Sequence, residues 1–186
     1  VSNIYFVYSG IVKVHKRWDE EKDLVIRFAG PGDILGHLGL GDDPVYPVTA
    51  TAIEPAVVCV VDLTFFESTL NVNPAFTYAL MKLFANEVQE SEKRMRNLVH
   101  MPVKERIALA LLNLKKQFGI TEQGNIGVEL SRQDLSSFAA VAYETLFKVM
   151  NEFQQNNLVA TTGKSIKLLN EPELVALTTD KSHSNA

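Results

Sequence analysis

Hydrophobic and polar positions alternate in short runs over the first third of the chain. The segments IVKVHK (11–16) and LVIRFAG (24–30) are rich in β-branched and aromatic residues, and the polar stretch RWDEEKD (17–23) separates them. This pattern predicts a β-hairpin with a longer loop, inside a unit of short strands that spans residues 4 to 62. Six of the ten glycines lie before residue 42, which favours tight turns over long helices.

The pattern changes to a helical one at Pro74. From there to His100 the chain has no further Gly or Pro and is rich in good helix formers. Pro74 suits the first turn of a helix, and Asn73 before it is a candidate N-cap. We therefore expect one long helix over residues 74–100.

Six positions of this helix follow one another at alternating spacings of three and four residues, which is a heptad seam with one polar member. The seam predicts a dimer interface between two parallel helices. A helix packed on its own sheet would give a similar pattern, and both can hold because Leu80 and Leu83 broaden the apolar face. The seam residues are Met81, Phe84, Val88, Ser91, Met95 and Leu98.

Pro102 breaks the helical pattern, and a second apolar stripe follows it. Ile107, Leu111 and Leu114 continue this stripe until Gly119 ends it. Residues 100–102 are therefore the expected hinge between two domains.

Two short helices and a hairpin are predicted after this stripe. Ser131 and Asp134 form a variant of the capping box, which starts a helix that turns Leu135, Phe138 and Ala139 inward. After a break at residues 140–142, an apolar stripe at helical spacing marks the second helix of a helix-turn-helix. Residues 158–169 then predict two strands around TTGKS, the shape of a wing. The stripe consists of Leu146, Val149, Met150 and Phe153.

The opposite face of the second helix carries groups that can contact DNA bases. Glu144 can accept a hydrogen bond from cytosine N4, Lys148 can donate to guanine, and Phe147 can meet a thymine methyl group. A merely solvated helix face is the alternative. Residues 131–170 carry four basic and three acidic side chains, and residues 93–116 carry seven basic and one acidic, so phosphate contacts could also come from the earlier helices. The full face consists of Tyr143, Glu144, Phe147, Lys148 and Asn151.

Composition is that of an ordinary globular protein and gives little direct indication of function. The 186 residues are 46% hydrophobic and carry a formal charge of −4. No apolar run approaches the roughly 20 residues of a membrane-spanning helix, so we expect a cytoplasmic protein without membrane contact.

Cys59 within AVVCVV is expected to be buried. With no nucleophile–base pair and no metal-ligand spacing, an enzyme is not expected. The chain starts in strand-like sequence at Val1, which predicts a missing preceding segment.

The stretch GPGDILGHLGLGDD (30–43) is unusually rich in glycine. Five of its fourteen residues are Gly, a density that lets the backbone approach a ligand closely, as in loops that cradle phosphate.

The order of these parts resembles the Crp/Fnr family of bacterial transcription regulators, over residues 4 to 169. The pieces that carry the resemblance are GDILGHLGL, VNP before the long helix, RIALALLNL after the hinge, SRQDL, ET in the second helix, and NNLV leading into GKSIKL. The resemblance implies an α+β fold in three parts. These are a β-roll, or cyclic-nucleotide-binding-like jelly roll, over 1–73, a dimerisation helix over 74–100, and a winged helix-turn-helix with a polar C-terminal tail over 101–186.

The resemblance further implies a homodimer on a two-fold DNA operator, controlled by an effector and acting on RNA polymerase. Four positions depart from the family pattern. Ala140 replaces a turn glycine, and Ala142 replaces a capping Ser or Thr. Tyr143 replaces a base-reading Arg, and Lys148 replaces the usual Arg with the same charge but without its fork geometry. The DNA-binding residues carried over are Arg132, Gln133, Tyr143, Glu144, Thr145, Phe147, Lys148 and Lys164.

The effector site departs further from the family. Nucleotide-binding members hold the ribose with a Glu and the phosphate with an Arg–Ser pair, whereas here His37 stands at the Glu position and DDPVYPVTA (42–50) contains no Arg or Lys. Cyclic AMP is therefore not expected, and the effector is left open. Two alternatives remain: a haem-based sensor using His37, and a sensory module that acts through protein partners. The pocket residues carried over are Gly36, His37, Leu38, Gly39, Tyr46, Ser91 and Glu92.

Overall fold

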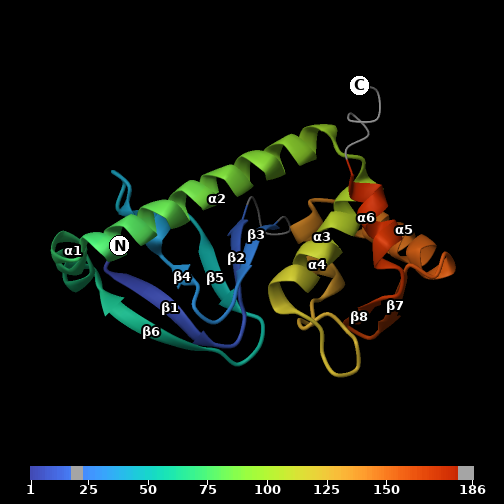
Figure 1. The fold of residues 1–186 in the computed structure, drawn as a ribbon, viewed down its shortest axis with the longest axis horizontal. Helices are drawn as coiled ribbons and strands as arrows, with labels where there is room; N and C mark the ends of the chain where they lie inside the picture. Colours follow the sequence, from blue (N-terminus) through green and yellow to red (C-terminus); the bar gives the residue numbers. More distant parts are fainter. Residues whose placement is uncertain (18–22, 180–186) are drawn as a thin grey trace. The chain divides into compact units, whose positions relative to one another are not determined.

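The computed structural model describes residues 1–17 and 23–179. Two compact units share them, Val1–Arg96 and Asn97–Ala186 (Figure 1). The first unit holds two antiparallel sheets and the second a helical domain with a small hairpin, which confirms the α+β fold class.

The sheets of the N-terminal unit are three-stranded, in the orders β4-β1-β6 and β3-β2-β5. The predicted hairpin is confirmed, since β2 and β3 pair antiparallel from Val12↔Ala29 to Arg17↔Asp23; its loop, 18–22, lies outside the described residues. Alternating side chains of both sheets meet in a core of Val7, Val12, Val14, Ala29 and Leu35. The strands are β1 (Asn3–Ser9), β2 (Val12–Arg17), β3 (Asp23–Ala29), β4 (Ile34–Leu35), β5 (Thr49–Ala52) and β6 (Val57–Asp62).

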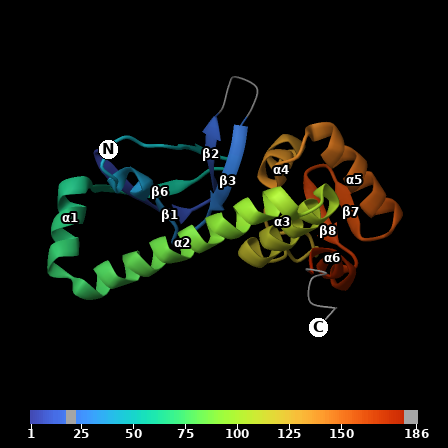
Figure 2. The same ribbon diagram turned by 90° about the horizontal axis from the view of Figure 1, so that it is seen from above.

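Two helices follow the sheets, and Figure 2 shows the corner between them. The helix α1 (Leu63–Val72), which the sequence analysis did not predict, starts at Asp62, whose side chain accepts hydrogen bonds from the first turn. The helix α2 (Pro74–His100) starts as predicted, because the Asn73 Oδ1 accepts a hydrogen bond from the Phe76 N–H at 3.0 Å. No helix in the described ranges is long and apolar enough to cross a membrane.

One face of α2 packs on the sheets. Leu80 is buried with Ile4, Ile34 and Phe66, and the half-buried Phe84 packs against the same cluster. Further along the helix, the Arg94 guanidinium donates to the carbonyls of Ile26 and of Val25, the latter at 2.6 Å. These carbonyls belong to β3, an outer strand of its sheet, and burial lowers the pKa of Arg94. The prediction that α2 covers its own sheet is therefore confirmed.

Cys59 is exposed, which contradicts the prediction that it is buried. It lies on β6, which stands beside β1 at the end of the sheet as the described residues form it. The run AVVCVV is a continuous apolar stretch, which is typical of a strand covered on both faces. Here Val57 and Val60 are exposed as well, so hydrophobicity alone did not indicate burial.

The C-terminal unit has the predicted order of elements. The apolar stripes are buried as expected, with Ile107 and Leu111 on α3 and Leu146 and Phe153 on α5 all at 0% exposure. The segment after the wing, expected to be a polar tail, instead begins with the helix α6, whose Leu174 is buried. The elements of this unit are α3 (Val103–Phe118), α4 (Arg132–Ala139), α5 (Tyr143–Gln155), β7 (Val159–Thr162), β8 (Ser165–Leu168) and α6 (Glu171–Thr178). The short 3-10 helix η1 (His37–Leu40) belongs to the first unit.

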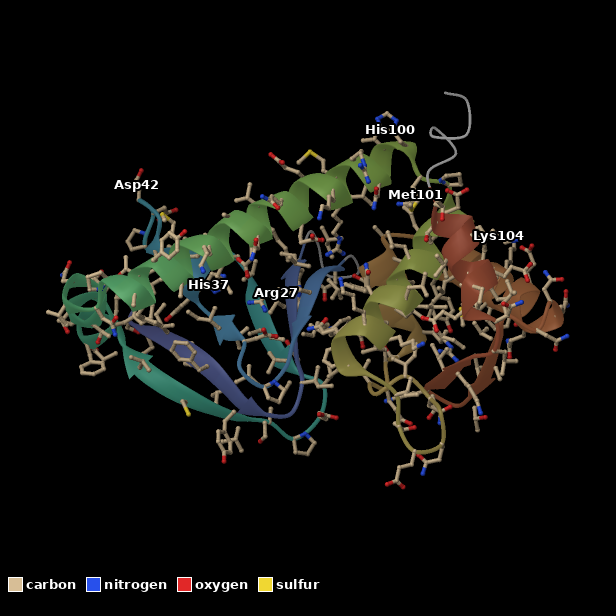
Figure 3. All side chains as sticks on the ribbon, in the orientation of Figure 1. Arg27, His37, Asp42, His100, Met101 and Lys104 are labelled. Atoms are coloured by element: carbon tan, nitrogen blue, oxygen red, sulfur yellow. The ribbon has the colours of Figure 1, made fainter. Side chains whose placement is uncertain are left out.

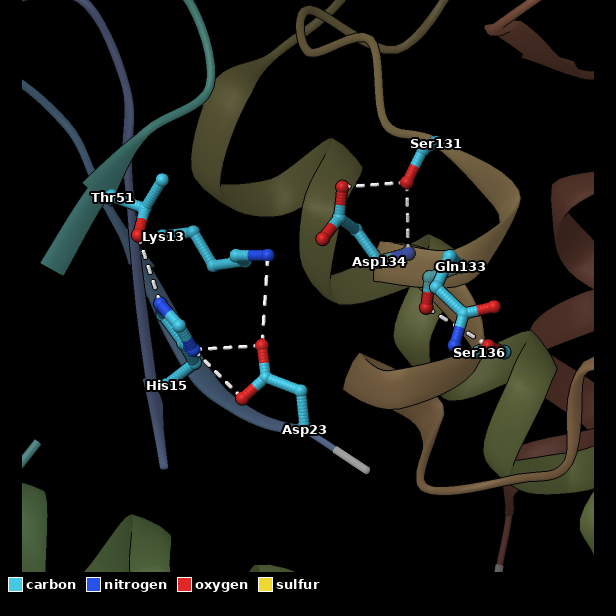
Figure 4. Close-up of polar contacts among 8 residues, drawn as sticks. All are labelled: Lys13, His15, Asp23, Thr51, Ser131, Gln133, Asp134 and Ser136. Carbon is cyan, nitrogen blue, oxygen red and sulfur yellow. Dashed lines mark hydrogen bonds and ion pairs between the residues drawn. The ribbon is translucent and has the colours of Figure 1, made fainter. Parts of the chain in front are cut away.

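Ser131 caps α4 as the sequence predicts (Figure 4). Its Oγ accepts a hydrogen bond from the Asp134 N–H at 3.0 Å and donates one to the Asp134 carboxylate at 2.6 Å. Both the start of the helix and its acidic first turn are thus satisfied within four residues.

The turn between α4 and α5 places a non-glycine residue in the left-handed region. Ala140 has φ 53° and ψ 51°, a conformation that costs an L-residue with a Cβ about 1–2 kcal/mol. Its N–H donates to the end of α4, and its carbonyl accepts from the Arg106 guanidinium at 3.0 Å. The surrounding hydrogen bonds hold Ala140 in this strained position.

We expect Ala140→Gly to stabilise the C-terminal unit by about 1 kcal/mol, because glycine removes the left-handed strain and loses part of that gain to its greater freedom in the unfolded chain. Calorimetric unfolding of the full chain measures the difference. The control is Ala139→Gly, one residue earlier and helical, which should destabilise by about 1 kcal/mol. A destabilising Ala140→Gly would contradict the strain argument.

Candidate nucleic-acid interface and effector pocket

The second helix of the helix-turn-helix exposes the face that the sequence predicts. Leu146, Met150 and Phe153 are buried beneath α5. As a result Tyr143, Glu144, Phe147 and Lys148 point outward, whereas Thr145 and Asn151 are half-buried. Phe147 is 59% exposed, which is a large apolar area for a helix with no cover over it.

A shallow groove of about 160 Å³ runs along this face. It joins α4, α5 and the wing strand β7, and its walls combine aromatic rings with amide and hydroxyl groups. Such a mixture suits the contact of a base edge better than that of an apolar ligand. The groove is lined by Arg132, Tyr143, Leu146, Phe147, Met150, Asn151, Gln154 and Thr161.

Arg132 joins the first turn of α4 to the wing. Its Nη2 donates to the Gly163 carbonyl at 3.1 Å, while its buried Nη1 has no hydrogen-bond partner among the described residues. Burial lowers the pKa of Arg132, and the charge of Tyr143 acts in the opposite direction. A guanidinium with unused N–H donors beside an open groove is suited to an anionic oxygen. The neighbouring Gln133 is exposed.

The wing is a hairpin with a two-residue turn. Thr162 pairs with Ser165, so Gly163 and Lys164 form the tip, and Gly163 takes a φ of 59°. Lys164 is exposed at the tip. The predicted wing strands are thus confirmed, and the tip presents one cation.

The start of α5 lacks a side-chain cap, as the sequence predicts. Ala142 has the extended backbone of an N-cap, with φ −64° and ψ 146°, but no side-chain oxygen. The N–H groups of the first turn therefore have no side-chain acceptor from this position.

A larger pocket lies between the sheets of the N-terminal unit. It measures about 460 Å³ and its walls are mostly aliphatic. Of the residues predicted for an effector site, four line it, whereas Gly39 does not, and Ser91 and Glu92 are exposed on α2. The lining residues are Tyr5, Val12, Val14, Arg27, Leu35, Gly36, His37, Leu38, Tyr46, Pro47, Val48, Ala50, Ala52, Ala56 and Val58.

Polar groups gather around His37, at one part of this pocket. The imidazole is 2% exposed, and its Nε2 lies 2.8 Å from the Glu87 carboxylate of α2. Arg27 on β3 lies near the same carboxylate, with its Nε 3.8 Å from Glu87 Oε1. Figure 3 labels Arg27 and His37. The His37 Nδ1 is buried and has no partner among the described residues. Burial opposes ionisation of Glu87, but the hydrogen bond to His37 and the charges of His37 and Arg27 outweigh it and lower the pKa of Glu87.

Arg27 and Glu87 are two residues of this site that the sequence analysis missed. The search for a cation was confined to residues 42–50, which contain none. The cation of the pocket is instead Arg27, which lies on the strand β3. A charged residue inside the otherwise apolar run LVIRFAG was the available signal, because a buried charge needs a partner or a function.

The lining lacks several of the groups that commonly hold a cyclic nucleotide or a haem. Among the described residues that line the pocket, none is a Ser, Thr, Asn, Gln, Asp or Glu that could bind ribose hydroxyls. The Nε2 of His37, the usual iron-binding atom, is engaged by Glu87, and the lining offers no second His, no Cys and no Met. Within the described residues, no group of three or more His, Cys, Asp or Glu could hold a metal ion.

A carboxylate, an imidazole and a hydroxyl lie in line on the other sheet (Figure 4). His15 bonds the Asp23 carboxylate at 2.7 Å through Nδ1 and the Thr51 hydroxyl at 2.9 Å through Nε2. The sequence analysis found no such set, because the partners are 8 and 36 positions from His15. The three residues lie on β3, β2 and β5 and tie these neighbouring strands together.

Two family models match the chain and cover both units. The model described as the cyclic nucleotide-binding domain matches residues 1–73, and the Crp-like helix-turn-helix domain matches residues 105–177.

Known proteins of similar sequence and fold are bacterial regulators. The chain is 30% identical to the transcriptional activator protein Anr of Pseudomonas aeruginosa, over 94% of this chain and 72% of that protein. It is 27% identical to the cAMP-activated global transcriptional regulator CRP of Salmonella typhimurium, over 88% of this chain and 79% of that protein. The structure of FixK2 from Bradyrhizobium japonicum superposes with a TM-score of 0.84 at 22% identity, covering 97% of this chain and 89% of that one.

We expect the Glu87 carboxylate to stabilise the N-terminal unit above its usual pKa of 4.5 and to lose this effect as the pH falls through its lower value in the folded state. The melting temperature of wild type should therefore exceed that of Glu87→Gln at neutral pH, and the gap should close in acid. Glu90→Gln makes the same charge change on an exposed position of α2 and serves as control. A gap that persists at pH values well below 4.5 would contradict the assignment.

Proposed function

The chain belongs to the Crp/Fnr family of transcription regulators, and on that premise we propose that it acts as a homodimer on a two-fold DNA operator. It is a DNA-binding transcription regulator, as its relatives are. The observation that carries the proposal is the exposed face of α5 beside the spare donors of Arg132.

Base reading falls to the outward residues of α5. Glu144 accepts from a cytosine amino group, Lys148 donates to a guanine, and Phe147 covers a thymine methyl group. Tyr143 adds a ring and a hydroxyl at the start of the helix, where recognition helices approach base edges. Thr145, half-buried, faces the edge of this surface.

Backbone contacts come from the two ends of the groove. Arg132 and Gln133 lie at the start of α4, and Lys164 lies at the tip of the wing. These groups bind phosphates and fix the register of α5 in the major groove. Because residues 131–170 carry a net charge of only +1, the binding depends less on salt than that of a strongly basic domain.

The dimer forms along the exposed face of α2. Met81 and Val88 are 58% exposed and Met95 is 62% exposed, at seven-residue intervals. Phe84, expected on the same seam, instead packs against the β-sheet core and the His37 ring, at 5.5 Å between ring centroids. The seam therefore consists of the exposed apolar residues Tyr78, Met81, Val88, Met95, Leu98 and Val99 together with Ser91.

The three parts then divide the work. Residues 1–73 receive the effector, residues 74–100 form the dimer, and residues 101–186 bind DNA, in the cytoplasm, where the bound dimer contacts RNA polymerase. No observation favours a haem sensor or a module that acts only through protein partners.

For DNA recognition, we expect Glu144→Gln and Lys164→Gln to act in different ways. Operators selected from a random DNA library should lose about 1–3 kcal/mol of base discrimination at one position with Glu144→Gln. Lys164→Gln should weaken binding to all DNA sequences alike, and it should reduce the slope of the logarithm of the binding constant against the logarithm of the salt concentration by about one. Lys82→Gln is the control, because it removes the same positive charge as Lys164→Gln but from α2 in the first unit. The proposal fails if the full chain selects no sequence, or if both variants bind as wild type does.

For assembly, we expect Val88→Glu to weaken the dimer at least tenfold, because burying an unpaired carboxylate costs several kcal/mol and about 1.4 kcal/mol is a factor of ten. Sedimentation equilibrium measures the change. Gln89→Glu adds the same charge at the next, exposed position and should leave the dimer intact. A dimer that tolerates Val88→Glu would place the interface elsewhere.

A further inference from the structure

We propose that the pocket of the N-terminal unit binds a small organic acid with an apolar body, and that Arg27 and His37 hold its carboxylate. This rests on the proposed role of the unit as effector receiver and names the chemical class of the effector.

The walls of the pocket select the body of the ligand. Val12, Val14, Leu35, Val48 and Val58 present methyl groups from four different segments, and a volume of about 460 Å³ is within the range of small-molecule sites. The Tyr46 hydroxyl is already engaged, since it donates to the Asn3 carbonyl at 2.9 Å. An aliphatic or aromatic body therefore fits these walls, whereas a sugar would leave its hydroxyls unbonded.

The polar groups select the head of the ligand. Arg27 has one short bond, from Nη2 to the Ile34 carbonyl at 2.5 Å, but its carboxylate pairs are long: 3.8 Å to Glu87 and 4.0 Å to Asp33. A guanidinium whose ion pairs are this loose has N–H donors left for a second carboxylate, which its planar fork matches. His37 adds the buried Nδ1 that has no partner among the described residues.

The charges at this end of the pocket balance when the acid is bound. Glu87 holds the Nε2–H of His37, so a neutral ring would present a lone pair at Nδ1, and this would repel a carboxylate. A ring that carries both protons instead donates to Glu87 and to the ligand at the same time. The two cations Arg27 and His37 then balance the carboxylates of Glu87 and the ligand. The other ionisable groups near this end are Asp33, at 4.0 Å from Arg27, and the hydroxyls of Tyr5 and Tyr46.

Binding of the acid would also change a contact of α2. Glu87 is the residue of α2 that pairs with both His37 and Arg27. A ligand carboxylate on these two cations competes with Glu87 for their charge. Binding in the pocket thereby changes a contact of the helix that carries the proposed dimer seam.

The test uses four probes and the full chain in isothermal titration calorimetry. The acids are 3-phenylpropanoate and octanoate, and the neutral controls are their amides. We expect at least one acid to bind at least tenfold more tightly than its amide. Arg27→Gln should remove this preference, while Lys16→Gln, which deletes an exposed cation of β2, should keep it. Arg27→Lys, which keeps the charge and loses the fork, should fall between the two.

Replacement of the His37 ring is the second measurement. His37→Gln, whose amide can still donate to Glu87, should weaken binding of the acid more than binding of its amide. The proposal is overturned if neither acid binds, if acid and amide bind equally, if Arg27→Gln keeps the preference, or if cyclic AMP binds in an Arg27-dependent manner. Circular dichroism checks that each variant folds. Loss of DNA binding with intact acid binding would instead count against the proposed function alone.

Discussion

The packing of α2 on the sheets through polar contacts is the interaction on which the N-terminal unit depends. Arg94 donates to two carbonyls at the outer edge of β3, and Glu87 accepts from the buried ring of His37. Edge carbonyls need a partner when they are covered, and a buried imidazole and a carboxylate satisfy one another. These polar contacts fix which face of α2 turns inward. The same choice fixes which face remains exposed, and so both the pocket and the proposed dimer seam follow from it.

The C-terminal unit could be predicted almost completely from its sequence, because its determinants are local. Buried positions recur at three and four residues along α3 and α5, and Ser131 caps α4 through a partner only three positions away. The turn at Ala140 and the two-residue tip at Gly163 are likewise short segments whose position along the chain could be predicted locally. Periodicity and capping are rules of short range, and they apply here without interference from distant segments.

The pocket could not be predicted in the same way, because it depends on pairs far apart in the chain. Arg27 enters it from β3, and Glu87 reaches His37 across 50 positions. The heptad pattern of α2 included Phe84, although the rotation of the helix turns this ring inward. Cys59 was expected in a core, but its strand lies at the end of a sheet. The sequence shows whether each of these side chains is apolar or charged. Which residues surround it depends on the order of the strands and on the rotation of the helix.

Inward and outward residues of α2 stand next to each other at seven-residue intervals: Leu80 beside Met81, Glu87 beside Val88, and Arg94 beside Met95. One inserted or deleted residue rotates the rest of a helix by about 100°. A single insertion between Glu87 and Arg94 would therefore turn the guanidinium away from β3 and break the seam together with it. Even the insertion of a whole heptad, which would restore the rotation, would shift Arg94 by about 10 Å along the helix axis. The contacts of Glu87 and Arg94 therefore fix the length of this part of the helix, whereas the loops around it are free of that restriction.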